Sequence, residues 1–418
     1  MTIQETLQQG FHILSKPTGP ICNLDCEYCF YTEKEALFTG KPKFQMSIDL
    51  LETFVKKYIE TQRGPEVAFV WQGGEPTLRG LDFYKKAVEF QKKYANGKRI
   101  ENSLQTNGTL LNEDWCTFLR DNDFVVGLSI DGPEFIHDLY RVDRGQRKTF
   151  QRVVEALEML KEYGVEFNVL TCVTKESSQY PLEIYRYFKE MGVRFIQFIP
   201  IVERTADITA ASLGLRHAVP SSAKQEDIHR QVTEWTVEPE AYGDFLITIF
   251  DEWVRNDVGE IHIMNFEWAL TSWLGLSSNI CLFTENCGQA VIMEHNGDIY
   301  SCDHYVYPEY KLGNILTDCP EEMVDSREQI AFGKNKSLSL PQECQTCEVQ
   351  FACHGECPKR RFTMASNGDE GLNYLCKGYK KYFRHIHPYM KVIVQLIEHD
   401  LPASEVMNVI KGPLIVKM

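Results

Sequence analysis

The sequence predicts an α/β protein made of an open six-stranded (β/α) barrel followed by a small cysteine-rich domain. From residue 11 to about 200, short apolar runs alternate with longer segments of helical periodicity, the pattern of βαβ units and a parallel sheet. The 418 residues exceed one ordinary domain and fit a barrel plus a smaller unit. Nine of the fourteen cysteines fall within 281–376, so metal rather than a large apolar core is expected to hold that part together.

The expected strands are runs of apolar or β-branched residues, and the expected helices carry apolar residues at helical spacing. The strands are residues 11–15, 67–71, 102–105, 124–129, 166–172 and 195–198, and the helices between them are 48–59, 83–94, 150–163 and 181–191. A polar excursion over 203–242 precedes a helix around 245–254, and a last amphipathic helix covers 389–399. The predicted units are a barrel over 1–242, a linking helical segment over 243–275, the cysteine-rich domain over 276–386 and a helical tail over 387–418.

Composition and charge exclude some functions. The 44 Lys and Arg against 59 Asp and Glu give a formal net charge of -15, which argues against a nucleic-acid partner. The N-terminus lacks a signal-peptide pattern, and no stretch reaches the apolar length of a membrane helix, so a cytoplasmic protein without a membrane partner is expected. Disulfides do not persist in such a reducing compartment, and the cysteines therefore indicate metal binding or catalysis.

The residues that follow the strands should meet at one mouth, because functional groups of parallel (β/α) folds gather at the carboxyl ends of strands. Cys22, Cys26 and Cys29 follow the first strand as CxxxCxxC. Three thiolates on one loop suit a 4Fe-4S cluster and leave one iron open for a substrate or cofactor. The alternative is a zinc site that takes a distant fourth ligand.

This loop resembles that of the radical S-adenosylmethionine (SAM) family, which has a partial (β/α) barrel. The resemblance implies that the open iron binds SAM and that one electron cleaves it to a 5′-deoxyadenosyl radical. Gly73-Gly74-Glu75-Pro76 resembles the family's GGEP motif, in which a carboxylate and close backbone approach meet the methionine ammonium. Ser129 matches the ribose contact and Arg152 the methionine-carboxylate contact, although Arg152 could equally be a solvated helix residue. The implied cofactor-binding residues are Tyr28, Gly73, Gly74, Glu75, Ser129 and Arg152.

Eight cysteines after residue 280 resemble the SPASM-type extension of that family, which binds two further 4Fe-4S clusters. The resemblance implies a nearer cluster on Cys281, Cys287, Cys302 and Cys357, and an outer cluster on Cys344, Cys347, Cys353 and Cys376. Spacing alone does not give this pairing, and two zinc sites are the alternative. Cys116 and Cys172 are expected to be packed thiols, and Cys319 a loop residue.

Within this group the chain is most similar to the anaerobic sulfatase-maturating enzymes, through residues 22–31, 71–76, 105–108, 128–133 and 300–303. The resemblance implies oxidation of a Cys or Ser side chain of a sulfatase polypeptide to formylglycine, with auxiliary clusters as the electron sink and a flavodoxin or ferredoxin as reductant. Asp303 matches the family's proposed base, the alternative being a hydrogen bond to the cluster loop. Gln105 matches a substrate-peptide contact, the alternative being a buried polar residue.

Two other functions stay open at this point. A maturase that forms thioether or carbon-carbon crosslinks in a small peptide would share the architecture, but only about ten residues precede the first strand, which leaves no room for the peptide-recognition domain such enzymes often carry. An iron-sulfur or zinc regulator or electron carrier would need neither an open iron nor the GGEP-like turn. The sequence does not distinguish Cys-type from Ser-type substrates.

Overall fold

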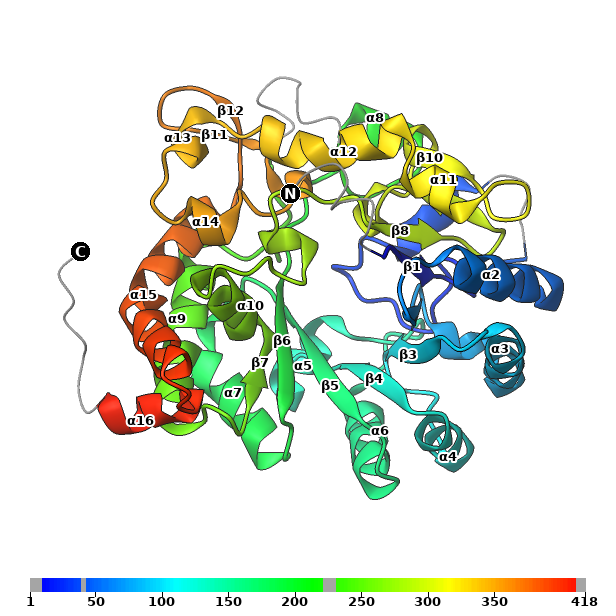
Figure 1. Ribbon diagram of the computed structural model, residues 1–418, viewed down its shortest axis with the longest axis horizontal. Helices are drawn as coiled ribbons and strands as arrows, with labels where there is room; N and C mark the ends of the chain where they lie inside the picture. The colour runs from blue at the N-terminus through cyan, green and yellow to red at the C-terminus, as the bar shows by residue number, and fades with distance from the viewer. Residues whose placement is uncertain (1–9, 39–42, 221–230, 411–418) are drawn as a thin grey trace.

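A ten-stranded sheet forms the centre of the computed structural model, which describes residues 10–38, 43–220 and 231–410 (Figure 1). Its order is β10-β9-β8-β1-β2-β3-β4-β5-β6-β7. The six expected strands are present and each is parallel to its neighbour, which confirms the barrel. They are β1 (His12–Ser15), β2 (Glu66–Trp71), β3 (Arg99–Thr106), β4 (Phe124–Ser129), β5 (Phe167–Val173) and β6 (Phe195–Pro200).

Helices lie outside the arc of strands and bury one apolar face against it (Figure 1). In the first of them, the Ser47 side chain caps the N-terminus by accepting a hydrogen bond from Leu50 N, and Leu51, Phe54 and Val55 are buried. The helices of the barrel are α2 (Ile48–Thr61), α3 (Leu81–Tyr94), α4 (Glu113–Asp121), α5 (Glu134–Tyr140), α6 (Phe150–Glu162), α7 (Pro181–Glu190) and the short α8 (Ile208–Ser212). Helix α8 lies in the polar excursion, of which residues 221–230 are outside the described part.

The cysteine-rich part continues the barrel sheet, which the sequence analysis did not predict. Strand β8 (Ala290–Met293) pairs in parallel with β1, and the antiparallel strands β9 (Asp298–Tyr300) and β10 (Lys311–Asn314) follow it. At the other edge, β7 (His262–Ile263) pairs with β6. Strand β8 therefore places the later segment beside β1, and Asp303, which comes after β9, contacts the side chains of Lys16 and Gln72 at the ends of β1 and β2.

Two long helices, α9 (Pro239–Asn256) and α15 (Cys376–Glu398), pack against each other at a pair of glycines. A Cβ on Gly378 would lie 1.9 Å from the Pro239 carbonyl oxygen, so only glycine allows this approach. Helix α15 begins well before the expected residue 389, and the expected boundaries at 242/243 and 386/387 fall inside α9 and α15. The division into units stays a prediction.

The remaining elements are short. They are β11 (Thr363–Met364), β12 (Glu370–Leu372), α10 (Met264–Trp273), α11 (Pro320–Val324), α12 (Arg327–Leu338), α13 (Gln342–Gln345), α14 (Gln350–Cys353) and α16 (Val406–Val409), with 3-10 turns that include η6 (Cys281–Phe283), η7 (Asp303–Tyr305) and η9 (Pro358–Arg360). Among the helices of the described residues, none has the length and apolar character to cross a bilayer.

Candidate active site

The three cysteines of the first loop lie together at the mouth of the barrel. Cys22 and Cys26 are buried, and Cys29 is partly exposed. Cys22 Sγ accepts hydrogen bonds from Leu24 N at 3.3 Å and from the Asn107 side-chain amide at 3.7 Å. Burial raises the pKa of Cys22 to about 12, and the nearby Cys29 thiol also raises it. The loop and the end of β3 therefore each supply an N–H donor to this sulfur, an arrangement that suits metal-bound thiolates.

The glycine turn after β2 supports this loop through its backbone. Gly74 N donates to Gly19 O and Glu75 N to Ile21 O, each at 2.9 Å. A Cβ on Gly74 would lie 2.1 Å from the Ile21 carbonyl oxygen, and Gly73 has a φ of +137°. Only glycines fit both positions, which explains the pair of glycines at this strand end.

The Glu75 side chain is fully buried and braces the same turn. Its Oε1 accepts hydrogen bonds from Thr77 N, Thr77 Oγ1 and Thr106 Oγ1, and its Oε2 accepts one from Asn107 N at 2.8 Å. Burial raises the pKa of Glu75 in spite of these donors. Because three of the four donors bind Oε1, the remaining hydrogen-bonding capacity of the carboxylate is at Oε2.

A buried ion pair lies behind the cysteine loop. Tyr28 donates its hydroxyl proton to Asp131 Oδ2 at 2.6 Å, and Arg141 contacts both carboxylate oxygens at 2.8 and 3.1 Å. Burial raises the pKa of Asp131, but the Arg141 guanidinium outweighs it and the pKa is lowered. Cys172 joins the group, since its sulfur lies 3.6 Å from Arg141 Nη2. The Tyr28 hydroxyl therefore points to this network.

Gln105 and Ser129 meet at the ends of β3 and β4, whereas Arg152 lies apart on α6. Gln105 Nε2 donates to Ser129 Oγ at 3.1 Å. Arg152 is 39% exposed at its side chain and pairs with Asp143 Oδ2 at 3.2 Å. Asp143 forms an isolated β-bridge with Leu24 of the cysteine loop. Arg152 is thus connected to the loop through Asp143.

Asp303 lies at the mouth although it comes from the cysteine-rich part. It begins η7 just after β9, and its Oδ1 forms an ion pair with Lys16 Nζ. Gln72 Nε2 donates to its Oδ2 at 3.2 Å. The Lys16 ammonium also lies 3.3 Å from the centre of the Tyr31 ring, whose hydroxyl bonds to Glu294. Asp303 therefore contacts the residues that directly follow β1 and β2.

The later cysteines form two groups, as their mutual effects on pKa show. In the first group, burial raises the pKa of each thiol, and each is raised further by another member of the group. The group consists of Cys281, Cys287, Cys302 and Cys357. In the second group, burial and another member of the group raise the pKa of Cys344, Cys353 and Cys376, and Cys347 is among the thiols that raise it. These are the two sets that the resemblance implies.

The donor chemistry of the three sets fits iron-sulfur clusters. Cysteine sulfur is the usual ligand of such clusters, and a 4Fe-4S cubane places each thiolate on a different iron. In the described part of the chain, no three His, Cys, Asp or Glu side chains are arranged as ligands of one metal ion. A 4Fe-4S cubane does not require its protein ligands to converge on one point, because each thiolate binds a different iron.

Two family models match the chain. The radical SAM superfamily model matches residues 17–188, and the SPASM model, described as an iron-sulfur cluster-binding domain, matches residues 281–348. The serine-type anaerobic sulfatase-maturating enzyme of Bacteroides thetaiotaomicron is 46% identical over 96% of this chain and 95% of its own length. The chain belongs to the anaerobic sulfatase-maturating enzymes. It converts a serine or cysteine residue of a peptide substrate to formylglycine and uses SAM and iron-sulfur clusters.

Other relatives of this sulfatase-maturating enzyme agree. The cysteine-type enzyme of Clostridium perfringens is 35% identical over 90% of this chain and 96% of its own. The structure of native anSMEcpe with bound AdoMet and Cp18Cys peptide has a TM-score of 0.79 at 33% identity, covering 92% of this chain and 99% of that one. These matches confirm the radical SAM partial barrel with a SPASM domain, and they do not support a crosslinking maturase or a metal-dependent regulator.

Three residues close to the candidate site of this sulfatase-maturating enzyme, two at the mouth and one behind the first loop, were not predicted as site residues from its sequence. They are Lys16, Gln72 and Arg141. Lys16 and Gln72 each follow a strand, so their position at a strand end was an available signal, while Arg141 has no local signal. Cys172, expected to be a packed thiol, packs against the apolar cluster around the first loop.

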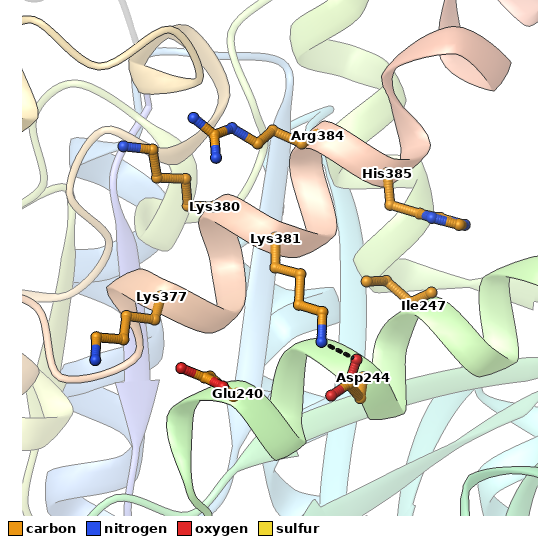
Figure 2. Close-up of a pocket in the computed structure, with 8 residues that line it drawn as sticks. All are labelled: Glu240, Asp244, Ile247, Lys377, Lys380, Lys381, Arg384 and His385. Carbon is orange, nitrogen blue, oxygen red and sulfur yellow. Dashed lines mark ion pairs between the residues drawn. The ribbon is translucent and has the colours of Figure 1, made fainter. Parts of the chain in front are cut away.

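A surface groove of about 670 Å³ lies between α9 and α15, away from these residues (Figure 2). Asp244 of α9 and Lys381 of α15 form an ion pair across it at 2.5 Å. Its lining is Glu240, Asp244, Ile247, Lys377, Lys380, Lys381, Arg384 and His385. The groove shares no residue with the predicted site of the sulfatase-maturating enzyme.

Proposed function

We propose that this enzyme forms formylglycine with three 4Fe-4S clusters and with Asp303 as the base. The convergence of Asp303 with the ends of β1 and β2 supports the base, and the two groups of mutually interacting thiols support two auxiliary clusters. Cys22, Cys26 and Cys29 would hold the cluster that binds SAM. The two groups of four listed above would hold the auxiliary clusters.

Oxidation of a side chain CH₂–XH to CH=X removes one hydrogen atom, one proton and one electron. When bound, SAM would supply the radical that takes the hydrogen atom, and an auxiliary cluster held by the later cysteines would accept the electron. Asp303 takes the proton from the substrate hydroxyl or thiol, since its side chain is 22% exposed at the mouth. For a cysteine substrate, hydrolysis of C=S then gives the aldehyde.

The remaining residues position the reactants. Ser129 contacts the ribose, Arg152 the methionine carboxylate and Gln105 the substrate peptide. The hydrogen bond between Gln105 and Ser129 supports this assignment because it places peptide and cofactor contacts side by side. Gly73, Gly74, Glu75 and Tyr28 shape the methionine site through the glycine turn and the network behind the loop.

We propose that serine-containing peptides are substrates, supported by the 46% identity to a serine-type enzyme against 35% to a cysteine-type enzyme. Anaerobic turnover of matched peptides that differ only in Ser or Cys at the target position tests the substrate. Failure with the serine peptide would contradict this substrate assignment.

We also propose a cytoplasmic location and a flavodoxin or ferredoxin as the electron donor, because fourteen cysteines and low-potential clusters need a reducing compartment.

The base is tested by Asp303→Asn under anaerobic conditions. We expect formylglycine formation to fall by at least about 100-fold while cleavage of SAM to 5′-deoxyadenosine continues. Asp298→Asn is the matched control, because Asp298 lies nearby on β9 and also pairs with a lysine, Lys311, at 2.6 Å. If the Asp303→Asn variant forms formylglycine at the rate of the Asp298→Asn control, Asp303 is not the base.

The number of clusters is tested by iron analysis. Three cubanes predict about twelve irons per chain, four for each cluster. Replacing Cys22, Cys26 and Cys29 together with alanine should remove about four irons and leave about eight. A loss of all iron, or an initial content near four, would contradict two auxiliary clusters.

A further inference from the structure

Lys16 and Gln72 occupy equivalent places at the ends of neighbouring parallel strands. Ser15 of β1 pairs in register with Trp71 of β2, and Gln72 N donates to Ser15 O at 2.9 Å. The next residue on each strand therefore reaches the same point at the mouth, where both side chains contact Asp303. Each contacts a different oxygen of this carboxylate.

Lys16 is held much more firmly than an ordinary surface lysine. It is 1% exposed, its ammonium lies over the Tyr31 ring, and the Tyr31 hydroxyl bonds to Glu294. Its own backbone N–H donates to Met293 O at 2.9 Å, so β8 fixes it from the other side. A buried ammonium is costly unless a carboxylate pairs with it. Asp303 forms that ion pair.

We propose that Lys16 is a positioning residue for Asp303. The ion pair fixes Oδ1, so that Oδ2, which receives only the Gln72 amide at 3.2 Å in this structure, is the oxygen that takes the substrate proton. A carboxylate attached to the short η7 turn would otherwise rotate, and a small displacement of a catalytic group costs a large factor in rate. This inference rests on the proposed role of Asp303 as base.

The test compares Lys16→Met with Lys16→Arg in the reconstituted full-length enzyme. In Lys16→Met we expect kcat for formylglycine to fall by about 10-fold or more, with the KM for the peptide within about twofold. SAM cleavage should continue, so more 5′-deoxyadenosine forms for each formylglycine. Lys16→Arg keeps a cation beside Asp303 and should restore kcat to within about threefold of the unmodified enzyme.

Lys34→Met is the matched control. Lys34 is also 1% exposed and its ammonium lies 3.4 Å from the centre of an aromatic ring, that of Tyr307, but it has no ion pair with Asp303 in the structure. We expect its ratio of 5′-deoxyadenosine to formylglycine to match that of the unmodified enzyme. An equal rise of this ratio in Lys34→Met would overturn the inference, because the effect would then belong to any buried lysine.

Further outcomes separate this inference from the proposed function. A Lys16→Met enzyme with unchanged kcat and product ratio, or a Lys16→Arg enzyme as impaired as Lys16→Met, refutes the positioning role. If Lys16→Met does not retain its iron, Lys16→Gln takes its place: its shorter neutral side chain removes the ion pair with Oδ1, and the same fall in kcat and rise in the product ratio are expected. An active Asp303→Asn would refute the base itself, whatever the Lys16 variants do.

Discussion

The first cysteine loop and the later cysteines are held in different ways. The first loop rests on the barrel: Glu75, Asn107 and Asp131 follow β2, β3 and β4, the first two are joined by a hydrogen bond, and Asp131 accepts one from Tyr28 of the loop. The later cysteines lie on or beside elements of three or four residues, such as η6, α13, α14 and η9, and at the start of α15. The fold positions the first set of cysteines, whereas regular structure contributes little around the later ones, where the proposed clusters would supply part of the stability.

Buried cations show how little regular structure supports the later cysteines. Lys336 is 1% exposed and donates to three carbonyl oxygens of the segment around Cys281, including that of Leu282 at 2.9 Å. Arg361 donates to the carbonyl oxygens of His354, Gly355 and Glu356 at 2.9–3.1 Å. These side chains satisfy groups that helices and sheets would otherwise satisfy.

The largest expected effect follows from loss of the proposed outer cluster. Cys376→Ala should destabilise the cysteine-rich part by about 3 kcal/mol or more, because binding of the metal group there is also folding energy. Anaerobic hydrogen exchange should show lost protection over residues 340–376 and retained protection in β1 to β6. In Cys22→Ala, by contrast, SAM cleavage should be lost while exchange changes little outside the first loop. Equal loss of protection in both variants would contradict the difference proposed between the first loop and the later cysteines.

The same comparison explains what the sequence could predict of the fold. Strands β1 to β6 were found because each is an apolar run separated from the next by a helical pattern. Strands β8, β9 and β10 have three or four residues, too few to show alternation, and only pairing with β1 makes them strands. The first turns of α15 were missed because they are rich in lysine, as in Lys377, Lys380 and Lys381, although Tyr379, Tyr382 and Phe383 are buried.

For the site, candidate ligands could be named from the sequence, and the residues that contact them could not. Cysteine spacing is a local signal, so all eleven proposed ligands could be named. The contacts of Asp303 with Lys16 and Gln72 join residues 287 and 231 positions apart, and they exist only because β8 adds the later segment to the barrel sheet. A single sequence carries no signal for such a tertiary contact.

A smaller effect is expected behind the first loop, from the buried His137. Its Nδ1 accepts from Asp131 N at 3.4 Å and its Nε2 lies 3.0 Å from Thr149 Oγ1, so the neutral ring suits both contacts. Burial, with the nearby Arg141 charge, lowers the pKa of His137 from 6.5 to about 4. Between these values the unfolded chain binds the proton and the folded chain does not, so stability falls as the pH falls from 6.5 toward 4.

The titration of His137 should therefore lower the free energy of unfolding at pH 5 by about 2 kcal/mol relative to pH 7. Anaerobic urea unfolding of the unmodified enzyme and of His137→Gln at both pH values measures it. The variant lacks the titrating ring, so its loss between pH 7 and pH 5 should be smaller by that amount. Parallel losses in the two proteins would show that the buried ring does not carry the acid sensitivity of this region.

The smallest effect separates a packing thiol from a ligand. Cys116 is fully buried in α4, among the apolar residues of the barrel core, and burial raises the pKa of its thiol to about 11. Cys116→Ala should cost about 1 kcal/mol through the small cavity it leaves, measured by urea unfolding, and should leave the iron content and SAM cleavage unchanged. A loss of iron in this variant would mean that a thiol of the regular barrel core serves a cluster. The regular fold and the proposed clusters would then not be two separate sources of stability, contrary to the difference between the first loop and the later cysteines.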